Sequence, residues 1–172
     1  MKINFFFLIF LFLMGCTSDQ AILSKKTSCP NVLFASEHST YIASNTQPIT
    51  LNNVSYKANI NNYEYSSECL EANDKIKGEL SLLFIVKPIQ ADVKKVFLPF
   101  YVAILNANDE LLDMQYYSVK DNLQKDEETN EYIETEIRTT INVQLLTSIQ
   151  QNYDNIFVIG FMLDEKKLSL LN

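Results

Sequence analysis

Apolar and polar residues alternate along several stretches of the chain. Residues 131–143 alternate most cleanly, with Ile, Thr and Val at the odd positions from 133 onward and charged or polar residues at most of the even ones. Residues 53–60 repeat the pattern with their apolar side chains at even positions. In a β-strand, successive side chains point to opposite faces, so residues with a period of two share one face. Both stretches therefore predict strands with one face in a core. Further strands are predicted at 31–36, 40–44, 75–87, 96–106, 110–119 and 155–163.

These segments favour a β-sandwich. The polar residues 106–109 form a turn signal between two strands and predict a hairpin. Residues 144–152 predict one or two helical turns, and Tyr153 after them is a candidate for the corner tyrosine of immunoglobulin-like domains. The sequence therefore predicts an all-β fold, an antiparallel β-sandwich of the immunoglobulin or fibronectin type with one short helix. A small β-barrel is the alternative.

One predicted strand is apolar on both of its faces. In residues 96–105, the even positions carry Val, Leu, Phe and Ile, and the odd positions include Phe97, Tyr101 and Leu105. Only one face of a sandwich strand meets the core, so the other is either covered by a loop or helix or offered to a partner. The candidates for covering it are residues 144–152 and the segment that precedes the domain. We predict a partner surface formed by Phe97, Tyr101, Leu105, Tyr116 and Tyr117.

The first 15 residues differ from the rest of the chain. One lysine precedes ten consecutive apolar residues, 5–14, which is about half of the roughly 20 that a membrane-spanning helix needs. A basic start, a short apolar centre and a small residue before a cleavage site are typical of a secretory signal peptide. The alternatives are an ordinary signal peptide followed by a chance cysteine, or a retained helical anchor.

Residues 13–16, Leu-Met-Gly-Cys, resemble the bacterial lipobox. The resemblance implies that Cys16 receives diacylglycerol and becomes the first residue after cleavage. The expected organisation is then a signal peptide at 1–15, a lipidated tether at 16–28 and a β-sandwich domain at 29–172. Because Thr17 stands where an aspartate holds some lipoproteins at the inner membrane, the resemblance favours the outer membrane, with the domain facing the periplasm.

Composition narrows the partners. The chain has 14 basic and 21 acidic residues, a formal net charge of −7. An acidic surface of this kind argues against nucleic acid and against electrostatic docking to anionic lipid. The membrane contact is therefore expected to come from the lipid on Cys16.

Two further cysteines, Cys29 and Cys69, would lie in an oxidising compartment after export. A disulfide between them is the default interpretation, and it would stabilise the fold by about 4 kcal/mol in the chain-entropy model. A metal site or a catalytic thiol is the alternative. A zinc site needs more ligands at regular spacing, and His38 is the only histidine in the chain.

The sequence carries no catalytic motif. A nucleophile activated by His38 would need a glycine-flanked turn, and the chain has three glycines in all. The acidic residues 121–131 could supply oxygen ligands for calcium, but they lack the spacing and the glycine of a calcium loop. We therefore predict a protein that is not an enzyme and needs no cofactor or metal.

Four segments together resemble small, uncharacterised envelope lipoproteins of alphaproteobacteria. They are the lipobox, the opening "CPNVLFASEHSTYI", the central "VFLPFYVAIL" and the closing "FVIGFML". The resemblance implies an envelope location but no activity, so it transfers no catalytic residue.

Three functions remain open at this stage. The first is a non-enzymatic lipoprotein that contacts an unknown envelope protein as a scaffold or adaptor. The second is a lipoprotein that binds a small or hydrophobic ligand between its sheets, at residues 82–86 and 97–105. The third is an envelope hydrolase that uses two converging carboxylates.

Overall fold

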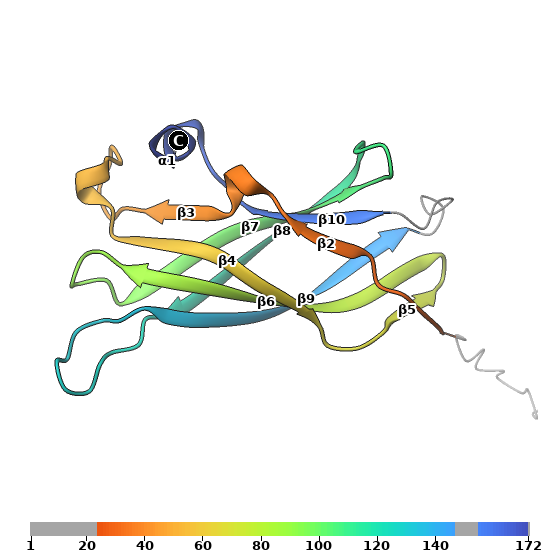
Figure 1. The fold of residues 1–172 in the computed structure, drawn as a ribbon, viewed down its shortest axis with the longest axis horizontal. Helices are drawn as coiled ribbons and strands as arrows, with labels where there is room; N and C mark the ends of the chain where they lie inside the picture. The colour runs from red at the N-terminus through yellow and green to blue at the C-terminus, as the bar shows by residue number, and fades with distance from the viewer. Residues whose placement is uncertain (1–23, 147–154, 172) are drawn as a thin grey trace, which may run out of the picture.

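The protein folds into two stacked β-sheets (Figure 1). The computed structural model describes residues 24–146 and 155–171. Its strands are β1 (Lys25–Thr27), β2 (Asn31–Phe34), β3 (Thr40–Ala43), β4 (Tyr56–Tyr65), β5 (Cys69–Ala72), β6 (Lys75–Pro88), β7 (Lys95–Leu105), β8 (Leu111–Asn122), β9 (Thr135–Leu146) and β10 (Ile156–Phe161). Its helices are the 3-10 turns η2 (Ser36–His38) and η3 (Leu51–Asn53) and the α-helix α1 (Glu165–Leu171).

The first sheet is built around β6, its longest strand. β9 pairs with one edge of β6, and β4 and β5 pair with successive parts of the other edge. β3 extends the sheet beyond β4, and β1 extends it beyond β5. The second sheet has the order β2-β10-β7-β8. β3 and α1 lie at one end of the molecule and β5 at the other (Figure 1).

The connections confirm the predicted sandwich. The chain passes from β6 in the first sheet to β7 in the second, returns from β8 to β9, and crosses again to β10. Immunoglobulin-like domains cross between their two sheets in the same way, with strands B and E in one sheet and C and F in the other. The alternative of a barrel is wrong, since the described strands form two separate sheets.

The structure corrects several details of the sequence prediction. β2 and β10 run parallel, whereas all other pairs are antiparallel. Residues 25–27, expected in the tether, form β1 against β5. Gln144–Leu146, expected in a helix, complete β9 instead. The remainder of that expected helix and Tyr153 lie outside the described residues.

The α-helix that the structure does contain follows the last strand, where the sequence analysis placed none. Its start is capped by Asp164, whose Oδ1 accepts a hydrogen bond from the Lys167 N–H at 2.8 Å. A helix of one or two turns is too short for a periodic pattern to reveal it. Its residues Leu170 and Leu171 pack against the small cluster of Ile42, Ile49 and Val54. No helix among the described residues is long and apolar enough to cross a membrane.

The core lies between β6 and β7. The apolar side chains of β6 and the even-numbered side chains of β7 meet there, and the rings of Phe84 and Phe100 lie 5.4 Å apart. Phe161 of β10 packs against Phe84 from the side, at 5.6 Å. All three rings are fully buried, so the centre of the sandwich is filled by side chains.

The predicted disulfide is present. Cys29 and Cys69 are bonded with their Cα atoms 5.1 Å apart, and they tie the segment between β1 and β2 to β5. Gly78 in β6 makes room for the bond, because a Cβ there would lie 2.6 Å from the Sγ of Cys69.

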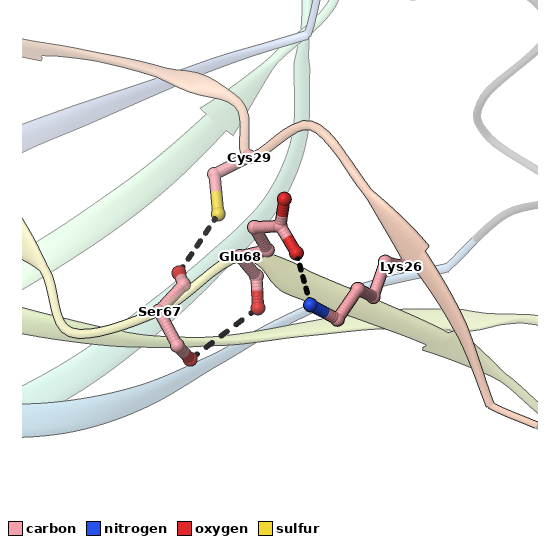
Figure 2. A network of polar contacts seen from close by, with 4 residues as sticks. All are labelled: Lys26, Cys29, Ser67 and Glu68. Atoms are coloured by element: carbon pink, nitrogen blue, oxygen red, sulfur yellow. Dashed lines mark hydrogen bonds and ion pairs between the residues drawn. The ribbon is translucent and has the colours of Figure 1, made fainter.

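Two further contacts attach the chain around Cys29 to the residues directly before β5 (Figure 2). Lys26 of β1 forms an exposed ion pair with Glu68, at 2.7 Å. The Sγ of Cys29 lies 3.8 Å from the carbonyl oxygen of Ser67. A disulfide sulfur carries no proton, so this is a packing contact. Water screens an ion pair this exposed, so the disulfide is the stronger of the two attachments.

Reduction of this disulfide is expected to destabilise the domain. The bond joins residues 40 positions apart, and loss of the cross-link should lower the free energy of unfolding by about 4 kcal/mol. Thermal unfolding with and without dithiothreitol measures the effect. The double variant Cys29→Ser/Cys69→Ser should match the reduced protein and not respond to the reductant. An unchanged melting temperature of the wild-type protein in dithiothreitol would contradict the assigned role.

Candidate functional site

The outer faces of the two sheets have opposite character. On the first sheet, the exposed side chains of β9 are polar or charged from Glu136 to Gln144. On the second sheet, Leu33 and Tyr116 are 54% and 64% exposed. Phe97 and Met162 are 43% and 42% exposed. We call the following outward side chains of the second sheet the apolar face: Leu33, Phe97, Tyr101, Leu105, Met114, Tyr116, Ile156, Val158 and Met162.

The strand register makes the apolar face continuous. Leu33 of β2 lies beside Val158 of β10, Val158 beside Ala103 of β7, and Ala103 beside Met114 of β8. One apolar row therefore crosses all four strands. Tyr101 and Tyr116 are cross-strand neighbours on β7 and β8 and continue the face. Cross-strand neighbours on one face have their Cβ atoms about 5 Å apart, so these side chains form one surface.

Four of the five residues predicted to form a partner surface belong to this face. Phe97, Tyr101, Leu105 and Tyr116 point outward, but Tyr117 does not. Successive strand residues point to opposite sides, so Tyr117 turns inward and stacks on Phe100 at 5.5 Å. Its hydroxyl lies 2.9 Å from the Asn142 carbonyl oxygen of β9 and so links the two sheets. Burial raises the pKa of Tyr117, with the nearby charge of Asp113 as a second cause.

One part of the apolar face is covered by the turn η2. A Cβ on Gly160 would lie 2.6 Å from the Tyr101 hydroxyl and 2.7 Å from the Cβ of His38, so both side chains pack onto the bare backbone of Gly160. The Nδ1–H of His38 donates to the carbonyl oxygen of Phe161 at 3.0 Å. Burial raises the pKa of Tyr101. His38 is thus half-buried and holds the turn in place.

A second feature begins where β10 leaves the sheet. β10 pairs with β7 as far as Phe100, and the last bond beyond this pair runs from the Met162 N–H to the Pro99 carbonyl oxygen. Proline has no N–H, so the nitrogen of Pro99 cannot donate a further hydrogen bond to β10. The ladder between these two strands can therefore end there without leaving a donor unpaired. The chain then turns away into α1, and no described strand pairs with this edge of β7 at Lys95–Phe97.

The hydroxyl of Tyr56 takes the place of the missing strand. It donates to the carbonyl oxygen of Phe97 at 2.8 Å and accepts from the N–H of the same residue at 3.0 Å. Tyr56 belongs to β4 in the other sheet and is only 5% exposed. Burial raises the pKa of Tyr56 to about 12. One side chain therefore satisfies both backbone groups of an otherwise open strand edge.

A cleft of about 580 Å³ lies beside this edge. Its lining comes from the end of β3 and the loop after it, from Tyr56, and from the adjoining ends of β7 and β8. The residues are Tyr41, Ala43, Ser44, Asn45, Tyr56, Lys95, Val96, Phe97, Lys120, Asp121 and Asn122. We call it the Tyr56 cleft. Sequence reasoning placed Tyr56 in the core but did not find this cleft, for which Pro99 inside a predicted strand was the available signal.

Both walls of the Tyr56 cleft are held by side-chain contacts. The Asn45 N–H donates to the Oγ of the buried Ser55 at 3.1 Å, and this Oγ donates to Gln90 at 3.2 Å. Behind the cleft, the ammonium group of Lys167 lies 4.9 Å from the ring centre of Tyr41. Burial raises the pKa of Tyr41, and the charge of Asp164 adds to the effect.

A second pocket, of about 440 Å³, lies between β8 and β9. Gln115 crosses it, because its Nε2 donates to the Gln144 carbonyl oxygen at 2.7 Å and to Asp113 at 3.1 Å. Its lining includes Leu145 and Leu146, and residues 147–154, which follow them, are not among the described residues. The sequence predicts a ligand between the sheets at residues 82–86 and 97–105. The Tyr56 cleft reaches Phe97 and this pocket reaches Ile104, but neither is lined by residues 82–86. Leu82 and Leu83 line a separate pocket of about 80 Å³.

The acidic segment after β8 forms a closed turn. The Oδ1 of Asp126 accepts hydrogen bonds from the N–H groups of Glu128 and Thr129 at 3.0 and 2.8 Å. These backbone donors, with the hydroxyl of Thr129, hold the pKa of Asp126 below its usual range. Within residues 24–146 and 155–171, no three His, Cys, Asp or Glu side chains are placed to hold a metal ion.

Comparison with known proteins finds no matching family model, no matching curated protein and no matching solved structure.

Removal of the Tyr56 hydroxyl tests its structural role. The variant Tyr56→Phe leaves two backbone groups of Phe97 without a partner, and the free energy of unfolding should fall by about 1–3 kcal/mol at neutral pH. Chemical denaturation measures it. Tyr63→Phe on the same strand, whose hydroxyl has no partner among the described residues, is the matched control and should change little.

The same pair of variants gives a pH signature. The folded pKa of Tyr56 is about 12, and an unfolded tyrosine titrates near about 10. The raised pKa contributes stability that is complete below pH 10 and is lost as the pH rises through 12. The stability gap between wild type and Tyr56→Phe should therefore narrow above pH 10. A gap that stays constant to pH 12 would contradict the assigned burial of the Tyr56 hydroxyl, which is the main cause of its raised pKa.

Proposed function

We propose that this chain is a lipid-anchored lipoprotein of the bacterial envelope, with a non-enzymatic role in contacting another envelope protein. The lipobox-like residues 13–16 support the anchor. A disulfide between Cys29 and Cys69 suits an oxidising compartment such as the periplasm. The observation that carries the proposed contact is the apolar face of the second sheet.

The apolar face supports protein contact because its composition is unusual for a sheet in water. Single exposed apolar residues are ordinary, but contiguous patches mark interaction sites. Here one row crosses four strands, the exposed Tyr116 stands beside it on β8, and the exposed Phe97 lies further along β7. Aromatic residues are enriched at interfaces because each one removes a large area from water at a small entropic cost. The polar outer face of the first sheet provides an internal contrast on the same molecule.

The proposed anchor limits where the partner can lie. Seven residues lie between Cys16 and Ser24, the first described residue, so the two are eight residue steps apart. Even a fully extended chain of that length spans only roughly 28 Å. The domain would therefore stay close to the bilayer, and its partner would be a membrane protein or another protein held at the same surface.

The alternative of a ligand enclosed between the sheets has weaker support. Phe84 of β6 and Phe100 of β7 meet at 5.4 Å and are fully buried, which leaves the centre of the sandwich filled. A ligand there would have to displace the aromatic core. The Tyr56 cleft and the pocket between β8 and β9 lie at margins of the sandwich.

Lipidation at Cys16 is tested by metabolic labelling with an alkyne-bearing fatty acid in the native host. The wild-type protein should incorporate the label, and Cys16→Ala should lose it and retain its leader. The control variant Thr17→Ala should still be labelled and processed. Label that persists in Cys16→Ala, or a wild-type protein without label, would contradict the proposed anchor.

Contact through the apolar face is tested by photo-crosslinking in cells. A photoreactive residue at position 116 should capture one dominant envelope protein, whereas one at position 140, exposed on the outer face of the first sheet, should not. The charge variant Leu33→Glu, assayed with the photoreactive residue at 116, should abolish the product, while Thr140→Glu should leave it intact. Equal products from positions 116 and 140, or a product that survives Leu33→Glu, would contradict the proposed surface.

A further inference from the structure

The Tyr56 cleft carries a local charge opposite to that of the whole protein. Three ionic side chains line it, namely Lys95, Lys120 and Asp121, so its lining has one net positive charge within a chain whose net charge is −7. Among the described residues, neither lysine forms an ion pair. Lys95 and Phe97 lie on the same face of β7, opposite Asn122 and Lys120 of β8. Both ammonium groups therefore belong to one side of the cleft.

The cleft also offers apolar surface next to these charges. Phe97 keeps 43% of its surface exposed, and the ammonium group of Lys120 lies 5.5 Å from the centre of its ring. Val96, Ala43 and the rings of Tyr41 and Tyr56 complete the apolar part of the lining. A volume of about 580 Å³ is within the range of small-molecule sites, and an apolar lining with a few polar groups is their usual composition.

From this combination we propose that the Tyr56 cleft binds a small organic monoanion, a carboxylate carried on a flat apolar body. The two lysines receive the carboxylate, and Phe97 with its apolar neighbours contacts the body. Asp121 selects against a second negative charge, so a doubly charged phosphate is disfavoured. The cleft shares Phe97 with the apolar face but lies apart from the row that runs from Leu33 to Met114. The variants that test one proposal leave the residues used to test the other unchanged.

An added peptide strand suits the cleft less well than a small molecule does. Strand addition needs a row of free backbone N–H and C=O groups on the receiving edge. On this edge of β7 the groups of Phe97 are already bonded to the Tyr56 hydroxyl, and Pro99 has no N–H. Only Lys95 remains to pair with a peptide.

The test uses 4-fluorobenzoate as the probe, observed by fluorine NMR with the full mature lipoprotein in non-ionic detergent micelles. Line broadening of the probe gives its dissociation constant. Micelles without protein correct for partitioning. The neutral isostere 4-fluorobenzamide has the same ring without the charge, and should bind at least about tenfold more weakly, since the lysines then contribute nothing.

The variants assign the binding to the cleft. Lys95→Gln and Lys120→Gln should each weaken 4-fluorobenzoate about threefold, and the double variant about tenfold, the range expected for exposed ion pairs. Lys77→Gln removes the same charge from an exposed lysine of β6 outside the cleft, and should change binding less than about twofold. Asp121→Asn should tighten binding. The melting temperature of each variant shows that the fold is retained.

Four results would overturn the proposal. The first is equal affinity for 4-fluorobenzamide, which would mean that the charge is not recognised. The second is no loss of binding in the double lysine variant, and the third is an equal loss in Lys77→Gln. The fourth is stronger competition by inorganic phosphate than by acetate, which would overturn the assignment of a carboxylate. Because position 116 is unaffected by these variants, the crosslinking result remains separate from all four.

Discussion

Pro99 is the constraint on which the arrangement of the second sheet depends. A proline between two neighbouring strands removes a hydrogen-bond donor, and sheets tolerate it only where a ladder ends. Here the paired residues of β7 and β10 end at Phe100, and the last hydrogen bond beyond them goes to the carbonyl oxygen of Pro99. The chain after β10 then turns away into α1, which packs its last two leucines on Ile42 and Ile49. The position of the last helix and the open edge of β7 both follow from this early end.

The hydroxyl of Tyr56 closes the open edge of β7 at Phe97. Unpaired strand edges invite pairing with other chains, and proteins block them with charges, bulges or covering segments. In this protein a buried hydroxyl from the opposite sheet occupies both backbone groups of Phe97. The two sheets are thereby joined at a point where their ends diverge, and the space between the ends becomes the Tyr56 cleft. The contact between Tyr56 and Phe97 therefore satisfies the open strand edge and also forms part of the candidate binding site.

The sequence predicted the sandwich because burial along its strands follows a simple period. The residues expected to face the core in 53–60 and 131–143 are buried with few exceptions, and β7 is buried at every even position. Ile133 is an exception, since it precedes β9 and is 40% exposed. The disulfide was predictable for a different reason, because it is the default interpretation of two cysteines in a chain whose first residues resemble an export signal.

The missed features depend on contacts between residues distant in the chain. β1 and β5 have three and four residues and become strands only by pairing with each other and with β6, so neither has a local signal. The inward direction of Tyr117 follows from the register of β8, which a one-residue error reverses. The parallel pairing of β2 with β10 joins segments more than 120 residues apart and likewise leaves no local pattern.

The two candidate surfaces rest on different physical terms. The apolar face depends on the area removed from water, which is insensitive to charge. The Tyr56 cleft depends on a local excess of one positive charge on a protein of net charge −7. At physiological ionic strength, charges farther than about 8 Å away are largely screened, so the lysines beside a bound carboxylate outweigh the distant acidic residues. An acidic protein can therefore hold an anion at one site, provided that the ligand carries no more negative charge than its immediate surroundings can neutralise.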